Sequence, residues 1–176
     1  MKRNVEHHRI MQVLALTLML AFFSPLLATA QAGKIDFSGT WAFNADKSNL
    51  GDNPNAGRMF SGNFVAKQEA NLLTVDRTRT NQSGETVTTT MKYTLDGKES
   101  VNTSQRGESK SVATWSADSK TLNIATTSTF EMNGDKITMK SSQSWTLTSP
   151  DVLTINNVRT GRDGEEVKTT IVYDKK

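Results

Sequence analysis

The chain has 176 residues, a formal net charge of +3, two histidines and no cysteine. Both histidines, His7 and His8, lie near the N-terminus, so the rest of the chain cannot build a Ser-His-Asp or Cys-His nucleophilic system. The same absence removes the usual ligands of zinc, copper and haem, and we expect neither a metal nor a cofactor. Catalysis could use only carboxylates, Lys, Tyr or Ser, so an enzyme is the least favoured class.

The first 30 residues have the pattern of a secretory signal peptide. A basic start is followed by an apolar stretch and a small-x-small site: Lys2, Arg3, Arg9, residues 13–23 and Ala28-Thr29-Ala30. We expect cleavage between Ala30 and Gln31, with a cut after Ala32 or an uncleaved anchor through residues 10–30 as alternatives. The protein is then exported, and is either periplasmic or fully secreted.

Removing these 30 residues from 176 leaves 146, so residues 31–176 have the size of a single domain. Of 21 basic residues three are lost, and of 18 acidic residues one is lost, which leaves 18 against 17 and a charge of about +1. Basic residues do not form a stripe with aromatic residues between them, so we expect no nucleic-acid partner. Without cysteine, the fold depends on its core and its hydrogen-bonded strands.

Apolar residues at every second position predict β-strands from residue 36 onward. The expected strands are residues 36–42, 60–68, 71–80, 85–95, 99–104, 109–117, 121–131 and 136–147, followed by a hairpin within 153–173. Turn-forming residues separate them at Glu69-Ala70, Gly84, Asp96-Gly97, Arg106-Gly107, Asp118-Ser119, Asn133-Gly134, Pro150-Asp151 and Gly164. The first strand should place Phe37, Gly39, Trp41 and Phe43 on one face.

The stretch from residue 44 to 58 is rich in Asn, Asp and Gly and contains Pro54, which predicts a long connection. Long connections are commonly lids, binding loops or disordered segments. A lid and a solvated loop are equally compatible with this composition.

Residues 73–93 and 153–173 are two copies of one pattern, related by an offset of 80. Ten of the 21 positions are identical: Leu73/Leu153, Thr74/Thr154, Arg79/Arg159, Thr80/Thr160, Gly84/Gly164, Glu85/Glu165, Val87/Val167, Thr89/Thr169, Thr90/Thr170 and Tyr93/Tyr173. Each copy is predicted to be a β-hairpin. In the first copy we expect Leu73 to pair with Tyr93, and then Val75 with Met91, Arg77 with Thr89 and Arg79 with Val87.

These elements predict an all-β fold, an antiparallel up-and-down meander barrel of about 8–10 strands. Gly39-Thr40-Trp41 and the following Asn44-Ala45-Asp46-Lys47-Ser48 resemble the opening of small exported bacterial proteins of the lipocalin-like, calycin type. The resemblance implies a barrel that binds apolar small molecules. In the family the tryptophan closes one barrel end beneath an arginine from a late strand, and Arg159 is the only arginine in the first strand of the last hairpin.

In a meander the connections alternate between two ends, so each turn can be assigned to an end by counting. One end collects large aromatic side chains and is expected to be closed by them: Trp41, Tyr93, Trp115, Trp145 and Tyr173. The long connection and the turns at Gly84, Gly107, Gly134 and Gly164 collect at the other end, which is expected to be the mouth.

Arg77 and Arg79 are expected to face the interior close to the mouth, and Arg159 repeats Arg79 in the second hairpin. Thr89 and Thr169 are the matching threonines of the two copies. An inward arginine could hold a carboxylate or phosphate with paired hydrogen bonds. Alternatively, these positions lie near enough to their turns to be in solvent.

The predicted function is therefore an exported, non-enzymatic barrel that binds a small apolar or amphiphilic ligand. Its apolar part would lie inward, with any anionic group toward Arg77, Arg79 and Arg159. The alternative is a structural or interaction protein of the cell envelope, with a barrel filled by side chains and a protein partner in place of a ligand.

Overall fold

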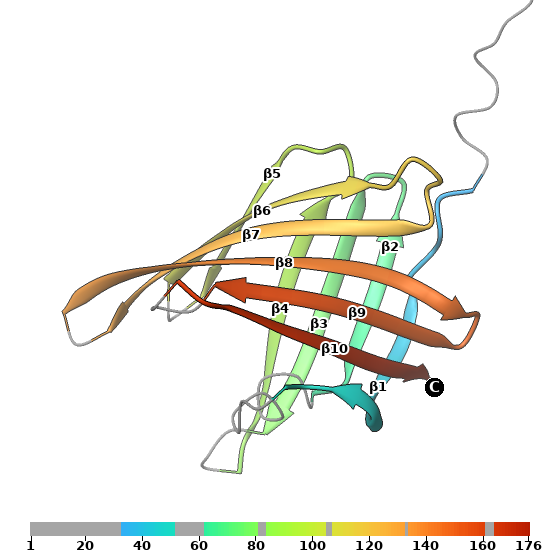
Figure 1. Ribbon diagram of the computed structural model, residues 1–176, viewed down its shortest axis with the longest axis horizontal. Coiled ribbons are helices and arrows are strands. Elements are labelled where there is room, and N and C mark those ends of the chain that lie inside the picture. The colour runs from blue at the N-terminus through green and yellow to red at the C-terminus, as the bar shows by residue number, and fades with distance from the viewer. Residues whose placement is uncertain (1–32, 52–61, 81–83, 105–106, 133, 161–163) are drawn as a thin grey trace, which may run out of the picture. The chain divides into compact units, whose positions relative to one another are not determined.

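All regular elements in the described part of the chain are strands (Figure 1). The structure is a computed structural model that describes residues 33–51, 62–80, 84–104, 107–132, 134–160 and 164–176. The strands are β1 (Gly39–Asn49), β2 (Phe64–Glu69), β3 (Leu72–Thr80), β4 (Thr86–Thr94), β5 (Glu99–Ser104), β6 (Gly107–Trp115), β7 (Thr121–Met132), β8 (Asp135–Ser149), β9 (Val152–Thr160) and β10 (Glu166–Lys175). The predicted cleavage site at Ala30 and Gln31 lies outside these residues.

The ten strands form one antiparallel sheet in the order β4-β3-β2-β1-β10-β9-β8-β7-β6-β5. Except for β4 and β5, each strand pairs with its neighbour in the sequence, and β1 pairs with β10. The sheet is therefore an up-and-down meander that curls into a nearly closed barrel. Figure 1 shows β2, β3 and β4 crossing the direction of β7 to β10. The predicted fold class is confirmed, with ten strands.

The seam of the barrel lies between β4 and β5, the two ends of the sheet order. Side chains of β5 replace the missing ladder there. The amide of Asn102 accepts a hydrogen bond from the backbone N–H of Lys92 at 2.8 Å and donates one to its carbonyl at 2.9 Å. Ser100 Oγ accepts from the N–H of Thr94 at 2.8 Å. The N–H and C=O of Lys92 and the N–H of Thr94, on the edge of β4, are thereby satisfied without a neighbouring strand.

The first strand starts later than predicted, at Gly39 in place of residue 36. The segment before it is held by the side chain of Gln68, whose Oε1 accepts from Phe37 N–H at 3.2 Å and whose Nε2 donates to Ile35 O at 2.9 Å. In these hydrogen bonds a side chain takes the place of the backbone groups of a neighbouring strand. Phe37 is fully buried, as its predicted inward position requires, but residues 36–38 are not part of the strand that was predicted to include them.

The first strand also ends later than predicted, because β1 continues to Asn49 through residues assigned to the long connection. The β1–β10 register shifts between Asn44 and Asn49. Within this bulge Ser48 Oγ accepts from the N–H of Val172 at 2.9 Å, and Asn44 Oδ1 accepts from the N–H of Lys47 at 3.0 Å. Asn and Ser therefore complete an irregular strand here. Residues 52–58 of the predicted connection lie outside the described part.

The other strands follow the predicted ranges closely, and β5 coincides with residues 99–104. The main difference is β6, which begins at Gly107 although a turn was expected there. Gly107 has a φ of +142°, and a Cβ built on it would lie 2.1 Å from the backbone oxygen of Thr129. Only glycine permits this approach of β6 to β7.

The two sequence copies form hairpins with the same register. Leu73 pairs with Tyr93 and Leu153 with Tyr173, and the predicted partners of Arg77 and Arg79 are Thr89 and Val87. In the second hairpin Asn157 stands where Arg77 stands in the first, opposite Thr169. The register prediction is confirmed by this pairing.

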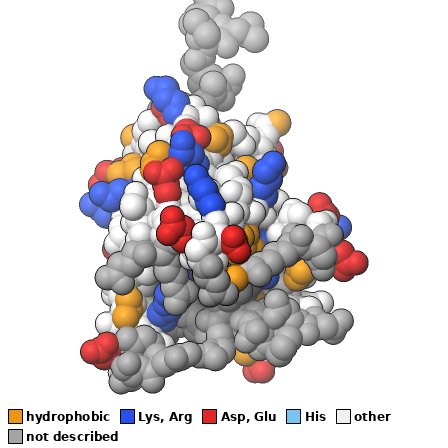
Figure 2. Space-filling model, turned by 90° about the vertical axis from the view of Figure 1, so that its left-hand side faces the viewer, with side chains coloured by type: hydrophobic (Ala, Val, Ile, Leu, Met, Phe, Trp, Pro, Cys, Tyr) orange, Lys and Arg blue, Asp and Glu red, His pale blue; other side chains and the backbone are white. Residues whose placement is uncertain are grey.

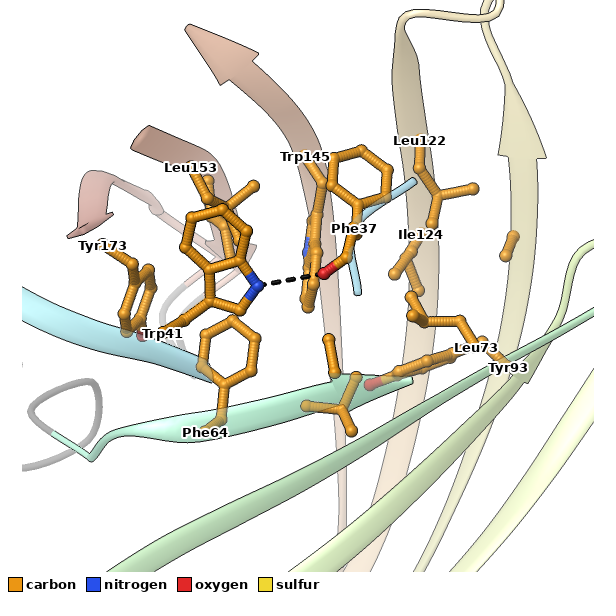
Figure 3. Close-up of a cluster of buried hydrophobic side chains, with 14 of the residues drawn as sticks. Phe37, Trp41, Phe64, Leu73, Tyr93, Leu122, Ile124, Trp145, Leu153 and Tyr173 are labelled. Atoms are coloured by element: carbon orange, nitrogen blue, oxygen red, sulfur yellow. Dashed lines mark hydrogen bonds between the residues drawn. The ribbon is translucent and has the colours of Figure 1, made fainter. Parts of the chain in front are cut away.

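A buried aromatic and aliphatic cluster packs one part of the barrel interior (Figure 3). Its largest fully buried members are Trp41, Tyr173, Phe37 and Phe64. Trp41 donates from Nε1 to the carbonyl of Phe37 at 2.9 Å, which satisfies its only polar atom. Phe64 packs edge-on against Tyr173, with ring centres 4.8 Å apart. Such burial contributes about 1.5–3 kcal/mol for each large side chain.

Candidate ligand-binding site

A cavity of about 210 Å³ lies inside the barrel, between the strands β3 and β4 and the strand β8. The described residues that line it fall into an apolar and a polar group of four each: Val75, Met91, Tyr93 and Trp145, and Arg77, Arg79, Thr89 and Gln143. Both groups come from alternate positions of their strands, because side chains at every second position share a face.

Burial along β3 decreases from the packed cluster toward the opposite end. Leu73 is fully buried and Val75 is nearly so, whereas Arg77 is half-buried and Arg79 is exposed. The β3–β4 register carries the same gradient across the cavity, from Tyr93 to Thr89. The cavity therefore opens at the arginine level and is closed below by the buried rings.

Arg77 is held in place by aromatic and polar contacts. Its Nη1 donates to the hydroxyl of Tyr173 at 3.0 Å and to the carbonyl of Gly62 at 3.3 Å. Its guanidinium carbon lies 5.0 Å from the ring centre of Phe64 and 5.7 Å from that of Tyr173, within the range of cation–π attraction. None of the ion pairs found among the described residues includes Arg77 or Arg79.

Two aromatic side chains form the inner wall. Burial raises the pKa of the Tyr93 phenol to about 12, while the positive charge of Arg77 acts in the opposite direction. Trp145 donates from Nε1 to Oε1 of Gln143 at 2.9 Å. Gln143 lines the cavity, and its side-chain amide also carries two N–H donors.

Beyond the buried cluster, the side chains of β6 and β7 that face the barrel interior carry hydroxyl groups. Ser111 and Thr126 share a hydrogen bond of 2.9 Å, and Ser109 and Ser128 share another of 2.9 Å. Ser111 has the same alternation as the buried Ala113 and is itself buried. The wall facing the barrel interior thus changes from apolar to polar along these strands.

Of the predicted ligand-binding residues, the structure brings Arg77, Arg79 and Thr89 together on one cavity. Thr169 is buried, and its hydroxyl accepts from Nδ2 of Asn157 at 3.3 Å. Arg159 is half-buried on β9, opposite Val167. Arg159 and Thr169 are not among the described residues that line the cavity.

The five residues expected to close one end divide between two roles. Trp41 and Tyr173 are fully buried, and Trp115 stacks on Phe37 with ring centres 5.9 Å apart. Tyr93 and Trp145 are also buried but expose part of their surface to the cavity. The cation over Trp41 is Lys175, with Nζ 5.6 Å from the ring centre, and not Arg159 as the resemblance suggested.

Sequence reasoning missed Gln143, and it missed Val75 and Met91 as cavity residues. The signal for Gln143 was available, because it lies two residues before Trp145 on a strand and so shares its inward face. Val75 and Met91 were predicted only as a cross-strand pair of the first hairpin. That they border an unfilled space could not be deduced from alternation.

The described surface carries mixed charge. Figure 2 shows Lys and Arg side chains interspersed with Asp and Glu on one face, with hydrophobic side chains isolated among them. The exposed large hydrophobic residues in the described part, Val65, Val87, Val101 and Met132, lie on four different strands. Within the same residues no cluster of three or more acidic or histidine side chains could hold a metal ion. Nor does the described part contain a helix long and apolar enough to cross a membrane.

The fold is similar to that of a known structure. A variant of the fluorescent protein UnaG matches with a TM-score of 0.53 and 16% sequence identity, over 80% of this chain and 96% of that chain. No protein-family model matches the sequence, and no curated protein matches it.

The match supports the fold class predicted from the sequence, an all-β barrel of antiparallel strands in an up-and-down meander. At this level of identity the likeness concerns the fold alone, so the chemistry of the site rests on the cavity residues of this chain.

Proposed function

We propose that the mature protein is an exported, non-enzymatic barrel that holds one small amphiphilic ligand in the cavity of Arg77, Arg79, Tyr93 and Trp145. The observation that carries the proposal is the cavity of about 210 Å³, with cationic donors on one side and aromatic rings on the other. An apolar enclosure with a few convergent polar groups is the usual form of a small-molecule site. The calycin-type fold supports the same function.

The arginines orient the ligand in this proposal. The apolar part lies against Tyr93 and Trp145, and the anionic group lies at the level of Arg77 and Arg79. A guanidinium that is partly desolvated gains most from an anion that it can bind with two parallel hydrogen bonds.

Two measurements test this function: native mass spectrometry after mild extraction, and displacement of an environment-sensitive dye. We expect one ligand or dye per chain. The variant Met91→Trp should abolish binding by filling the cavity. The control Thr90→Trp places the same ring on the opposite face of β4 and should leave binding intact. A folded protein with no dye uptake and no copurifying ligand would contradict the proposal.

Export is proposed from the leader pattern alone. Protein recovered outside the cytoplasm should have the mass of a chain that begins at Gln31. Retention of residues 1–30 would support the uncleaved anchor instead.

A structural or interaction protein of the envelope is the second candidate. The extent of side-chain filling favours it, because Phe37, Trp41, Phe64 and Tyr173 occupy one part of the interior completely. Crosslinking in the native envelope distinguishes the two: a reproducible protein partner, together with an empty lumen in the dye assay, would favour this function.

A further inference from the structure

The size of the cavity limits the ligand. Its volume of about 210 Å³ lies below the 300–1,000 Å³ that ligand pockets commonly have. The fully buried rings of Phe64 and Tyr173 pack against the Arg77 guanidinium, so a long chain cannot extend past Arg77 toward β2 and β10.

A long apolar chain also lacks a suitable path in the other direction. The inner wall beyond the cluster presents the paired hydroxyls of Ser109, Ser111, Thr126 and Ser128, and the amide of Asn157 on β9. An alkyl tail laid over these groups would gain little, because the stabilisation of a buried chain depends on the apolar surface that it covers. The interior therefore disfavours a fatty acid.

The charge of the cavity selects an anion. Arg77 and Arg79 contribute two guanidinium groups, and Thr89 and Gln143 add a hydroxyl and amide N–H donors. The described residues that line the cavity include no Asp or Glu. Arg77 is already fixed through Nη1 by Tyr173 and Gly62, so it meets a ligand with little loss of side-chain freedom.

The apolar side of the cavity is suited to a ring. Tyr93 and Trp145 present aromatic surface, and the Met91 thioether is a good neighbour for an aromatic ring. The indole N–H of Trp145 already donates to Gln143, so the ligand does not have to supply a hydrogen-bond acceptor for it.

We propose that the ligand is a single-ring aromatic carboxylate, with its ring against Tyr93, Trp145 and Met91 and its carboxylate toward Arg77 and Arg79. This inference rests on the proposed ligand-binding function and names the chemical class that the site selects. Its three elements are ring, negative charge and small size, and each can be tested separately.

The experiment is calorimetric titration of the folded mature chain with four probes. Benzoate is the reference, benzamide removes the charge, cyclohexanecarboxylate removes the aromaticity, and palmitate exceeds the cavity in length. We expect one benzoate per chain, a benzamide affinity lower by about tenfold or more, as loss of one charged contact produces, weaker binding of cyclohexanecarboxylate, and no stoichiometric binding of palmitate.

Variants connect the result to the residues. Arg79→Gln, at an exposed position, should weaken benzoate binding severalfold and leave benzamide binding unchanged. Lys92→Gln removes a charge from the opposite face of β4 and should change neither. Equal affinities for benzoate and benzamide would overturn the inference, as would equal effects of the two variants.

Failure of this inference is distinguishable from failure of the proposed function. If palmitate or the dye binds once per chain, is excluded by Met91→Trp, and benzoate does not bind, the aromatic-carboxylate inference is wrong and the ligand-binding function stands. If no probe binds to the folded chain, both are wrong.

Discussion

Lys175 covers the indole of Trp41, with its Nζ 5.6 Å from the ring centre, and Gly39 leaves the space in which the lysine lies. A Cβ on Gly39 would come within 2.7 Å of Lys175 Cε, and Gly39 has a φ of +150°. The Gly-x-Trp pattern thus has a physical explanation in this chain. The glycine lets a cation from the last strand cover the tryptophan of the first.

Gly39→Ala and Lys175→Ala should therefore be coupled. Gly39→Ala should cost about 1 kcal/mol through backbone strain and displacement of the lysine. Lys175→Ala should cost about 0.5–1 kcal/mol through the lost cation–π contact. The double variant should cost less than the two together in denaturant unfolding, because the lysine can be displaced only once. Strict additivity would contradict the proposed contact.

Substitutions at the packed end of the barrel should destabilise the protein more than substitutions at the arginine end. Trp41→Ala removes a fully buried ring and should cost roughly 3–5 kcal/mol. The pair Arg79→Ala and Arg159→Ala should leave the free energy of unfolding within about 1 kcal/mol, because Arg79 is exposed and Arg159 only half-buried. Urea melts measure both. An arginine pair as destabilising as the tryptophan would show that these arginines are structural.

Alternation and turn residues were sufficient to predict the meander, the hairpin register and the inward positions of Arg77 and Trp145, because each follows from a period of two. They failed where side chains replace backbone pairing. Gln68 holds the segment before β1, and Asn44 and Ser48 hold the bulge in it. Asn and Ser favour turns in general, so their use within an irregular strand is not visible in a single sequence.

The candidate site was only partly predictable for a related reason. The sequence places Arg77, Arg79 and Thr89 on one face, but their distance from the rings depends on how the sheet closes. In the curled sheet, the hydroxyl of Tyr173 on β10 lies 3.0 Å from Nη1 of Arg77 on β3. It also leaves Arg159 outside the residues that line the cavity. Sheet closure is a long-range property that no local pattern encodes.

The side-chain amide of Asn102 should protect the backbone N–H of Lys92, on the edge of β4, from hydrogen exchange. In Asn102→Ala the N–H and the carbonyl of Lys92 lose the partners that they have at the seam. We expect faster hydrogen exchange at the Lys92 amide and a loss of about 1 kcal/mol in stability. Asn102→Asp keeps the acceptor and removes the donor, so it should protect the amide partially. The control Thr103→Ala, on the same strand, should leave exchange at Lys92 unchanged.

The pKa of Asp174 should depend on the hydrogen bonds that Asn44 and Lys47, at the bulge in β1, donate to it. Hydrogen bonds from Asn44 and then Lys47 hold its pKa below the usual value. Its stabilising contribution is present above the ordinary pKa of an aspartate and is lost as the pH falls through the lowered value. Asn44→Ala should raise the Asp174 pKa toward its ordinary value in an NMR titration. An unchanged pKa would show that Lys47 alone is responsible.

The raised pKa of Tyr93 should lower the free energy of unfolding at alkaline pH. Its pKa is about 12 in the folded protein, against an ordinary value of 10, so the unfolded chain releases the proton first as the pH rises. The contribution is complete below pH 10 and is lost between about pH 10 and 12, where a difference of two units corresponds to about 2–3 kcal/mol. Tyr93→Phe lacks the proton and should not show this part of the decline. The measurement is the difference between the unfolding free energies of the two proteins at pH 9 to 12, because lysine titration is common to both. If the difference stays constant across this range, Tyr93 is not the desolvated phenol that its position in the inner wall requires.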